Sequence, residues 1–392
     1  MSYRYRSKTF LAISTLVSRS EMSYKRKTQT NRKNSKKLKT EKNSGEYCFP
    51  QDRCMLNDSH DFISDLSKVQ SDDVEGPLIG DHETQESEGG EADLHKHLAH
   101  CKKNPGHKQF IPIDTFTLKH LPEDLQHYDF YECIKVIADL TVRVSVLINS
   151  PHRPKFWPET TEPYPFYNMS ERRNCRTGSG RVWHVNKFQD GVRQDKGYRD
   201  IDYTKCWCRK CENSDSPSNV WWEFDVDTAT HVVFDDIEAS HTTLRLFFDS
   251  DKSPVVNVDK VSVKYVNIED DFCWLKCVTC DKNVGNKLMN MWEHFENVWE
   301  KVCNKYSASG SKHKFTFIVS HPHGCSKQVS LGYWKDRHKV GVRSKFTYTT
   351  CKCPGSSGAY VHCLGFANWT SSDLVHSGSL KSGLNCSGIG RV

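Results

Sequence analysis

The chain has 392 residues, enough for two to three domains at roughly 150 residues each. Lys and Arg total 55 against 49 Asp and Glu, so the net charge of +6 is too small to indicate a nucleic-acid or membrane protein by itself. The most apolar segment, 142–148, contains Arg143, and no run of ~18 uncharged apolar residues exists, which excludes a membrane-spanning helix. Fibrous and disulfide-miniprotein classes are excluded as well.

Two oppositely charged blocks lie at the start of the chain. Residues 1–45 carry 13 Lys and Arg against two Glu, a net of +11, and residues 46–95 carry 14 Asp and Glu against two basic residues, a net of −12. Neither block holds the apolar clusters that offset chain entropy, so we expect a disordered charged extension over 1–109. Its basic run Lys25 to Lys42 suits either a solvated tail or a nuclear-localisation or phosphate-contacting segment.

The first twenty residues resemble a signal peptide only faintly. Arg4, Arg6 and Lys8 precede the apolar run Phe10 to Val17, but no small-residue cleavage site follows. We therefore favour a cytoplasmic location, with secretion or the nucleus as alternatives.

Order is expected to begin near Phe110. Apolar residues recur at helical spacing from Pro122 to about Asn149, which predicts one amphipathic helix. The Pro-rich segment 151–165 then predicts an extended connector. We interpret 110–177 as a helical adaptor with this connector.

From residue 178 the pattern changes to short alternating runs separated by turn residues, which predicts an all-β sandwich or barrel over 178–392. A helix is expected within it at Lys287 to Tyr306. The predicted strands are Arg181 to Val185, Val220 to Phe224, Thr243 to Phe248, Val261 to Val266, Phe315 to Val319, Lys345 to Thr350 and Tyr360 to Leu364.

Three short motifs in this part suit acyl transfer. Thr228-Ala229-Thr230 leads to His231, Asp271 opens an apolar run, and Ser357 lies on a glycine-flanked turn. A serine hydroxyl becomes a nucleophile when a neutral imidazole accepts its proton and a carboxylate holds that imidazole in the useful tautomer. Asp270 and Ser356 are adjacent alternatives, and the following apolar pattern favours the second residue of each pair.

These motifs resemble those of trypsin-like, chymotrypsin-fold serine peptidases. Thr228 to His231 resembles Thr-Ala-Ala-His, Asp271 to Leu275 resembles Asp-apolar-Ala-Leu-Leu, and Gly355 to Ala359 resembles Gly-Asp-Ser-Gly-Gly. Two weaker motifs, 178–182 and 320–324, resemble the hairpin strand before the histidine and the Gly-x-Pro-x-Gly strand of the glutamyl-endopeptidase and high-temperature-requirement branches. The resemblance covers roughly residues 175–392.

The resemblance implies two six-stranded antiparallel barrels with the site between them. It implies His231 as general base, Asp271 as its partner, Ser357 as nucleophile, and the N–H groups of Gly355 and Ser357 as the oxyanion hole. Ser356, Ala359 and Tyr360 depart from the usual pattern around the nucleophile and predict a reshaped turn. The chain lacks an Ile-Val-Gly-Gly activation start, so activation by a freed amino terminus is not expected.

Val375-His376-Ser377-Gly378 resembles the strand that lines the primary specificity pocket of this family. A histidine there is similar to that of glutamyl endopeptidases and viral three-C-type peptidases, which implies a preference for Glu or Gln before the scissile bond. An exposed histidine at a strand end is the alternative. We therefore take His376, Ser377 and Gly378 as candidate substrate-binding residues.

The cysteines allow a metal site, disulfides or buried thiols. Short spacings of the kind that zinc uses join Cys206, Cys208 and Cys211, and a second pair joins Cys277 and Cys280. Disulfides are the competing interpretation for Cys175, Cys351, Cys353, Cys363 and Cys386. No metal is assigned to catalysis on these patterns, and the first five cysteines remain candidate ligands.

A second group of ligand-type residues, His95, His97, His100, Cys101 and His107, borders the charged extension and is interpreted as a solvated stretch. Asn168 and Asn368 open glycosylation tripeptides, which matter if the chain is secreted.

The sequence thus favours a serine endopeptidase that acts on protein or peptide substrates without a cofactor and without a membrane. A catalytically inactive trypsin-fold module that binds proteins is the main alternative. Nucleic-acid binding through Lys25 to Lys42 is the weaker one, and it predicts a steep salt dependence. The oligomeric state is left open.

Overall fold

The computed structural model describes residues 78–82, 85–87, 91–170, 172–194, 205–306, 313–366 and 374–392. Every described residue belongs to the unit Asp73–Val392, which is called the second unit. The possible signal peptide, the basic run Lys25 to Lys42 and the glycosylation candidate Asn368 lie outside the described residues. Among the helices that the structure describes, none has the length and apolarity needed to cross a membrane.

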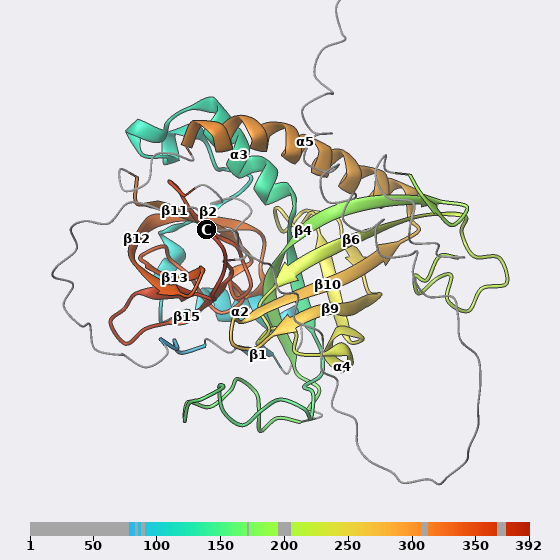
Figure 1. Ribbon diagram of the computed structural model, residues 1–392, viewed down its shortest axis with the longest axis horizontal. Helices are drawn as coiled ribbons and strands as arrows, with labels where there is room; N and C mark the ends of the chain where they lie inside the picture. The colour runs from blue at the N-terminus through green and yellow to red at the C-terminus, as the bar shows by residue number, and fades with distance from the viewer. Residues whose placement is uncertain are drawn as a thin grey trace, which may run out of the picture. The chain divides into compact units, whose positions relative to one another are not determined.

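The first sheet is antiparallel, and three neighbouring strands in it, β4, β6 and β10, carry most of the candidate active site. Its strands run in the order β8-β7-β3-β4-β6-β10-β9, with β1 and β5 also paired to β4 (Figure 1). Their bounds are β1 Glu86–Ser87, β3 Thr141–Val146, β4 Cys175–Gln189, β5 Val192–Arg193, β6 Val220–Thr228, β7 Thr242–Leu246, β8 Val256–Val258, β9 Val261–Asn267 and β10 Phe272–Thr279.

The second sheet is also antiparallel and follows the order β14-β11-β12-β13-β16-β15, with β2 paired to β12. Val375, just before β15, forms an isolated bridge with Tyr360, just before β14, and Ser379 of β15 forms one with Asp81. The strands are β2 Phe110–Pro112, β11 Phe315–Ser320, β12 Gln328–Val340, β13 Arg343–Tyr348, β14 Val361–Cys363, β15 His376–Ser379 and β16 Asn385–Ser387.

Two long helices pack against each other beside the sheets, as Figure 1 shows: α3, Tyr128–Asp139, and α5, Lys282–Tyr306. Phe130 of α3 meets Tyr306 of α5 and Phe317 of β11, so one apolar core joins the helices to both sheets. Shorter helices are α2 Glu91–Ala99, α4 Asp236–Ala239 and the 3₁₀ turns η1 Pro105–His107, η2 Leu118–His120, η3 Glu123–Leu125 and η5 Pro322–Gly324.

Each of the seven predicted strands coincides or overlaps with an observed strand, and the predicted second helix is α5, which begins five residues earlier. The prediction of one helix over 122–149 was wrong. The helix ends at Asp139, and Thr141–Val146 form β3, a central strand whose residues are all buried. The β-branched run Thr-Val-Arg-Val-Ser-Val suits a pleated strand between two neighbours better than a helix.

The expected boundary at residue 110 also differs from the structure. Within the predicted extension, α2 forms at 91–99 and η1 at 105–107, and Leu94 of α2 is buried. α2 packs on η5 and on β1, and its one buried leucine is too sparse an apolar signal to be read from sequence alone.

The fold is mostly β, with two antiparallel sheets and few helices. This architecture is consistent with the expected trypsin-like arrangement. The described strands form one antiparallel sheet of nine strands and one of seven.

Candidate active site

His231 lies in the loop that follows β6. Two threonines hold this loop: Thr228 Oγ1 donates to the carbonyl oxygen of Ser179 on β4 at 2.8 Å, and Thr230 Oγ1 donates to that of Phe272 on β10, also at 2.8 Å. The imidazole is consequently fixed between two strands and is 3 % exposed.

Asp271 contacts His231 through both the ring and the backbone. His231 Nδ1 lies 2.8 Å from Oδ2 of Asp271, and the backbone N–H of His231 donates to Oδ1 at 3.0 Å. The hydroxyl of Ser377 donates to Oδ2 at 2.6 Å. Burial by itself would raise the pKa of Asp271, but the charge and hydrogen bonds of His231, with the Ser377 hydroxyl, lower it below its ordinary value. The ionised carboxylate accepts Nδ1–H and so leaves the lone pair on Nε2.

The neighbouring carboxylate, Asp270, has different partners. It accepts from Asn267 Nδ2 at 2.9 Å and from the guanidinium of Arg343. Asp271 has a φ of 53° in the turn before β10, and this bend separates the directions of the two side chains. Of the two aspartates considered from sequence, Asp271 is therefore the one that the structure brings to His231.

The two adjacent serines also differ. The Ser356 hydroxyl lies 3.1 Å from that of Ser320 and accepts the backbone N–H of Cys353 at 3.4 Å. The Ser357 hydroxyl makes no hydrogen bond within the described part of the chain, and the residue is 4 % exposed. His231 Nε2, although buried, likewise has no hydrogen-bond partner among the described residues.

Gly178 and Ser179 of β4 bring the serine loop against the histidine loop. A Cβ at Gly178 would lie 2.6 Å from Val232 and 3.1 Å from the carbonyl oxygen of Ser357, so only glycine allows both loops to approach. Ser179 donates its N–H to Ser357 O at 2.8 Å and its hydroxyl to Gly355 O at 2.8 Å. The weak sequence motif at 178–182 thus corresponds to the strand that joins the two parts of the site.

The turn around Ser357 presents backbone N–H groups. Gly355 has a φ of +91° and Gly358 a φ of +82°, a region that side chains other than glycine rarely enter. The Gly358 N–H donates to His376 O at 3.0 Å, whereas the N–H groups of Gly355 and Ser357 donate to no group in the described ranges. These two N–H groups are the pair predicted to receive a developing oxyanion.

Tyr360, at the position where the resemblance implies proline, bears on the predicted reshaping of this turn. The Tyr360 hydroxyl donates to Asp227 and accepts Trp183 Nε1–H at 2.9 Å. Ala359 is buried and donates its N–H to Ser356 O at 3.1 Å. Tyr360 therefore fastens the turn to β4 and β6, whereas Ala359 bonds within the turn itself.

His376 on β15 is completely buried. Its Nδ1 lies 2.5 Å from the Tyr348 hydroxyl, and its Nε2 has no partner among the described residues. Burial, with the nearby positive charge of Lys352, lowers the pKa of His376 well below its ordinary value, so the ring is neutral near pH 7. The alternative of an exposed strand-end histidine is wrong.

A segment from the amino-terminal side lies on the same strand. Asp81 and Ser379 form an antiparallel bridge with two backbone hydrogen bonds, and a Cβ at Gly378 would lie 3.0 Å from Asp81 O. The next residue, His82, stacks on Trp157 with ring centroids 4.6 Å apart and meets His231 edge-on at 4.7 Å. Sequence reasoning missed this contact because nothing local to Asp81 and His82 indicates a partner nearly 300 residues away.

A buried ion-pair network supports the histidine loop from behind. Glu238 of α4 receives Nε of Arg153 at 2.7 Å and lies 2.5 Å from a terminal nitrogen of Arg176. The two arginines also donate to the carbonyl oxygens of His231 and Val232. Burial would raise the pKa of Glu238, but the two guanidinium groups lower it. No sequence motif had singled out these three residues.

Four of the five candidate cysteines converge. The sulfur atoms of Cys206, Cys208, Cys211 and Cys280 all lie within 4.8 Å of one another, and those of Cys208 and Cys280 are 3.3 Å apart. Cys277 is separate, since it lies on β10 within the main apolar core. The cysteines of the described residues are all free thiols, which contradicts the disulfide interpretation.

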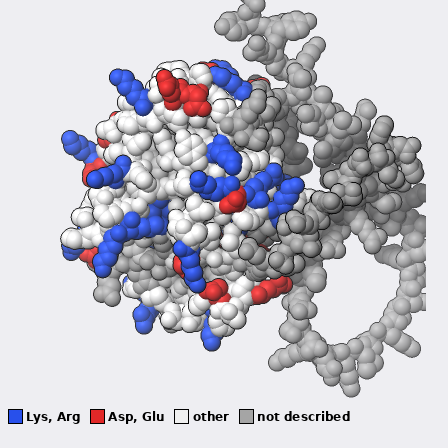
Figure 2. All heavy atoms as spheres, turned by 90° about the vertical axis from the view of Figure 1, so that its left-hand side faces the viewer, with Lys and Arg blue, Asp and Glu red and all other residues white. Residues whose placement is uncertain are grey.

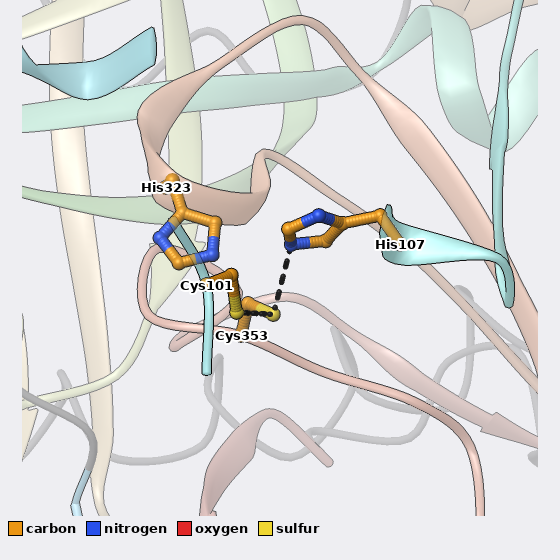
Figure 3. Close-up of side chains that lie close together, drawn as sticks. All are labelled: Cys101, His107, His323 and Cys353. Carbon is orange, nitrogen blue, oxygen red and sulfur yellow. Dashed lines mark hydrogen bonds between the residues drawn. The ribbon is translucent and has the colours of Figure 1, made fainter. Parts of the chain in front are cut away.

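A second ligand cluster joins the amino-terminal elements to the second sheet. Figure 3 shows Cys101 and His107 facing His323 and Cys353, and one ligand atom from each lies within 4.8 Å of all the others. Two of the five residues interpreted as a solvated stretch, Cys101 and His107, therefore belong to a packed cluster. The other three, His95, His97 and His100, lie outside it.

Comparison with known proteins gave only distant structural likeness. No family model and no curated protein matches the sequence. Among solved structures, the Rv3671c protease in its inactive form is similar over 65 % of this chain and 86 % of that one, with 10 % identity and a TM-score of 0.32. The HtrA-type protease AlgW with a tripeptide is similar over 65 % of this chain, with 10 % identity and a TM-score of 0.30.

The chain spans 58 % of that AlgW structure and 62 % of a serine-to-alanine form of AlgW with a decapeptide, to which it is 11 % identical with a TM-score of 0.32. All three neighbours are proteases, two of them of the HtrA type. Likeness at this identity and TM-score shows nothing about activity.

Proposed function

We propose that the protein is a serine endopeptidase that acts through His231, Asp271 and Ser357. The observation that supports this most is the buried Asp271–His231 pair beside a serine flanked by glycines. His231 Nε2 has no hydrogen-bond partner among the described residues, and the N–H groups of Gly355 and Ser357 donate to no described group. A buried polar atom without a hydrogen-bond partner destabilises the folded protein. Such an atom has a physical reason to exist where a bound substrate supplies the missing partner.

The residues divide the reaction between them. Ser357 Oγ attacks the carbonyl carbon of the peptide bond while its proton passes to His231 Nε2, and Asp271 stabilises the imidazolium through Nδ1–H. The N–H groups of Gly355 and Ser357 receive the oxyanion, for which each such donor is typically worth about 2.7–4 kcal/mol. His231 then gives the proton to the departing amine, and water hydrolyses the acyl-enzyme by the same route.

The proposed preference for Glu or Gln rests on His376. The single proton of the Tyr348 hydroxyl lies within reach of Cys386 O at 3.1 Å and of His376 Nδ1 at 2.5 Å. The proposal requires the tautomer in which Nδ1 accepts that proton, because the ring proton is then on Nε2, which can donate to a carboxylate or amide oxygen. Lys352, two positions before Pro354, adds positive charge near the ring. A substrate with Lys or Arg at that position would bring a second cation to this pocket.

A change of His376 to Leu tests this preference. Losing the donor leaves a substrate carboxylate or amide buried without its partner, so kcat/KM for peptides with Glu or Gln should fall about tenfold or more. Cleavage of peptides with an apolar residue at the same position should fall less. A wild-type enzyme that cuts best after Lys or Arg would contradict the preference while leaving the triad in place.

Substitution of the serine tests the activity itself. Ser357→Ala should abolish peptide hydrolysis while the circular dichroism spectrum stays unchanged. Ser356→Ala is the matched control and should retain hydrolysis, because its hydroxyl bonds to Ser320 and to the Cys353 N–H. If Ser356→Ala is the inactive variant the nucleophile is misassigned, and if folded wild-type protein cleaves nothing in a peptide library, the inactive binding module is the better account.

Peptides remain the proposed partners. On the face shown in Figure 2, Lys and Arg side chains are separated by uncharged and acidic ones and do not form a continuous basic stripe. The nucleic-acid hypothesis concerns the run Lys25 to Lys42, outside the described residues, and remains a prediction about salt dependence.

A further inference from the structure

We propose that the chain binds two structural zinc ions. Each site offers four ligand atoms that all lie within 4.8 Å of one another. Two cysteines with two histidines, and four cysteines, are donor sets that structural zinc takes. The His-Cys site consists of Cys101, His107, His323 and Cys353, and the four-cysteine site consists of Cys206, Cys208, Cys211 and Cys280.

The separations between ligand atoms match a tetrahedral ion. Zinc with ligands at about 2.0–2.3 Å holds those ligands roughly 3.3–3.8 Å from one another. In the His-Cys site the sulfur atoms of Cys101 and Cys353 are 3.6 Å apart, and Cys353 Sγ is 3.4 Å from His107 Nε2. In the four-cysteine site the sulfur atoms of Cys208 and Cys280 are 3.3 Å apart. A disulfide joins only two sulfur atoms, at about 2.0 Å, so it explains neither these distances nor the convergence of four ligands.

The two histidines of the His-Cys site are oriented as metal ligands are. Their ring centroids lie 5.2 Å apart at an interplanar angle of 89°, and Figure 3 shows both rings turned toward the sulfur atoms of Cys101 and Cys353. His323 Nδ1–H donates to Gln85 Oε1 at 2.5 Å, which leaves Nε2 as the ligand atom of His323. A hydrogen bond on the outer ring nitrogen is the usual support of a histidine that binds a metal.

N–H groups donate to sulfur atoms in both sites. Asn104 donates its backbone N–H to Cys101 Sγ at 3.4 Å and its side-chain Nδ2 to Cys353 Sγ at 3.0 Å. In the four-cysteine site the Ser218 N–H donates to Cys211 Sγ at 3.3 Å. Such outer contacts orient metal ligands and support them, and one asparagine provides them for both sulfur ligands of the His-Cys site.

Both sites lie in polar loops that have few apolar side chains with which to pack. Residues 100–109 contain no Val, Ile, Leu, Met, Phe, Tyr or Trp, and residues 205–219 contain only Trp207 from this set. Cys206, Cys208 and Cys211 are nevertheless buried. A loop that cannot bury an apolar cluster of its own needs another source of folding free energy, and a bound structural metal supplies one.

In the four-cysteine site, a tight turn brings two of the ligands together. The Cys211 N–H donates to Cys208 O at 2.8 Å and closes the turn 208–211. Cys206 precedes this turn, and Cys280 follows β10. Three ligands therefore come from one loop and the fourth from the end of a strand, so that an ion here fastens the loop before β6 to the first sheet.

The His-Cys site lies beside the loop that carries Ser357. The His323 N–H donates to Pro354 O at 2.5 Å, and a Cβ at Gly355 would lie 2.9 Å from His323 N. Zinc bound to His323 and to Cys353 holds both sides of this contact, which makes the two ligands positioning residues for the serine loop. This link to catalysis, unlike the two metal sites themselves, rests on the proposed function.

Elemental analysis of purified, reduced full chain tests both sites. Wild-type chain should hold about two zinc ions, and Cys353→Ser and Cys280→Ser should each lose about one. Cys351→Ser and Cys277→Ala are the matched controls and should keep both ions: Cys351 donates to Asn104 Oδ1 at 2.9 Å, and Cys277 lies in the main apolar core. Folded wild-type chain without zinc, iron in its place, or the loss of an ion in a control variant would overturn the assignment.

A second measurement needs no variant. Cys101, Cys280 and Cys303 are half-buried, and of these only Cys101 and Cys280 are proposed ligands. In folded wild-type chain, iodoacetamide should therefore modify Cys303 readily, and it should modify Cys101 and Cys280 only after a chelator has removed the zinc. Mass mapping of the modified residues follows all three at once. Equal modification of Cys101, Cys280 and Cys303 before chelation would contradict both sites.

Hydrogen exchange tests the link to the serine loop without using activity. In His107→Ala, amides of residues 351–357 should exchange about tenfold faster or more than in wild type, whereas Cys280→Ser should leave them unchanged. Unchanged exchange in His107→Ala would overturn the positioning role. Chain that binds two zinc ions but cleaves no peptide overturns the endopeptidase and leaves the metal sites in place, and chain that cleaves peptides without zinc does the reverse.

Discussion

At the scale of single residues, the proposed activity depends on which ring nitrogen of His231 carries the proton. The Asp271 carboxylate fixes Nδ1–H of His231, and Asp271→Asn would replace it with an amide that favours the opposite tautomer. We expect kcat to fall roughly 10⁴-fold, the typical loss for this change in a Ser-His-Asp triad, while KM changes little. Steady-state kinetics on a Glu-containing peptide measure both.

The matched variant is Asp270→Asn, whose carboxylate bonds Asn267 and Arg343 instead of His231. It should keep kcat within about tenfold of wild type, since such losses of a peripheral bond cost about 1 kcal/mol. Equal losses in the two variants would mean that Asp271 supports the fold rather than the proton transfer.

The three residues of the proposed triad could be singled out from sequence because their neighbours restrict them. Glycines flank Ser357, and an apolar strand follows Asp271, so each chemical group has a local pattern around it. His82, Arg153 and Glu238 have no such pattern. Their roles arise from contacts with distant parts of the chain, which local sequence does not record.

At the scale of elements, β4 organises the site. Ser179 binds the serine loop at two carbonyl oxygens and receives the His321 N–H at 2.9 Å. Ser179→Ala leaves buried groups without partners, a cost of about 1–3 kcal/mol. We expect kcat to fall roughly 5- to 150-fold with KM nearly unchanged, because the variant loosens the positions of Gly355 and Ser357.

Ser330→Ala on β12 provides the comparison, since Ser330 is equally buried but bonds only to Ile318 O within the described residues, at 3.5 Å. It should lose stability without losing kcat. A Ser179→Ala enzyme with full kcat would show that the serine loop holds its own geometry.

Whether a segment forms a helix or a strand was predictable where its apolar residues recur with a single spacing. α5 and the seven short strands follow clear periods, whereas Thr141–Val146 directly follows a helix and continues its apolar content, which hid the change to β3. The partners of a strand were not predictable in this way, because the position of β3 between β4 and β7 depends on how the whole sheet is paired.

At the scale of the whole second unit, stability depends on the buried network behind the histidine loop. Glu238→Gln would leave the Arg153 and Arg176 charges without their carboxylate. Breaking a buried pair in this way costs about 3–5 kcal/mol, and we expect urea unfolding to show a loss of that size. A loss below about 1 kcal/mol would contradict the importance of the network.

The pH dependence of stability has a definite sign. The pKa values of Glu238 and Asp271 are lowered in the folded chain, so the stability they contribute is complete above the unfolded values of about 4 and is lost as pH falls through the lower folded values. Unfolding free energy should therefore drop below about pH 4, and less steeply in Glu238→Gln. If the unfolding free energy falls with pH at the same slope in the wild type and in Glu238→Gln, Glu238 is excluded as a source of this pH dependence.

Mapping of a fluorophosphonate adduct by mass spectrometry shows directly whether Ser357 is an activated nucleophile. Wild-type chain should carry one adduct, on Ser357, and the Ser357→Ala, His231→Ala and heat-unfolded chains should carry none. Folded wild-type chain without an adduct, or with one on Ser356, would contradict the assignment of Ser357 as a nucleophile activated by His231.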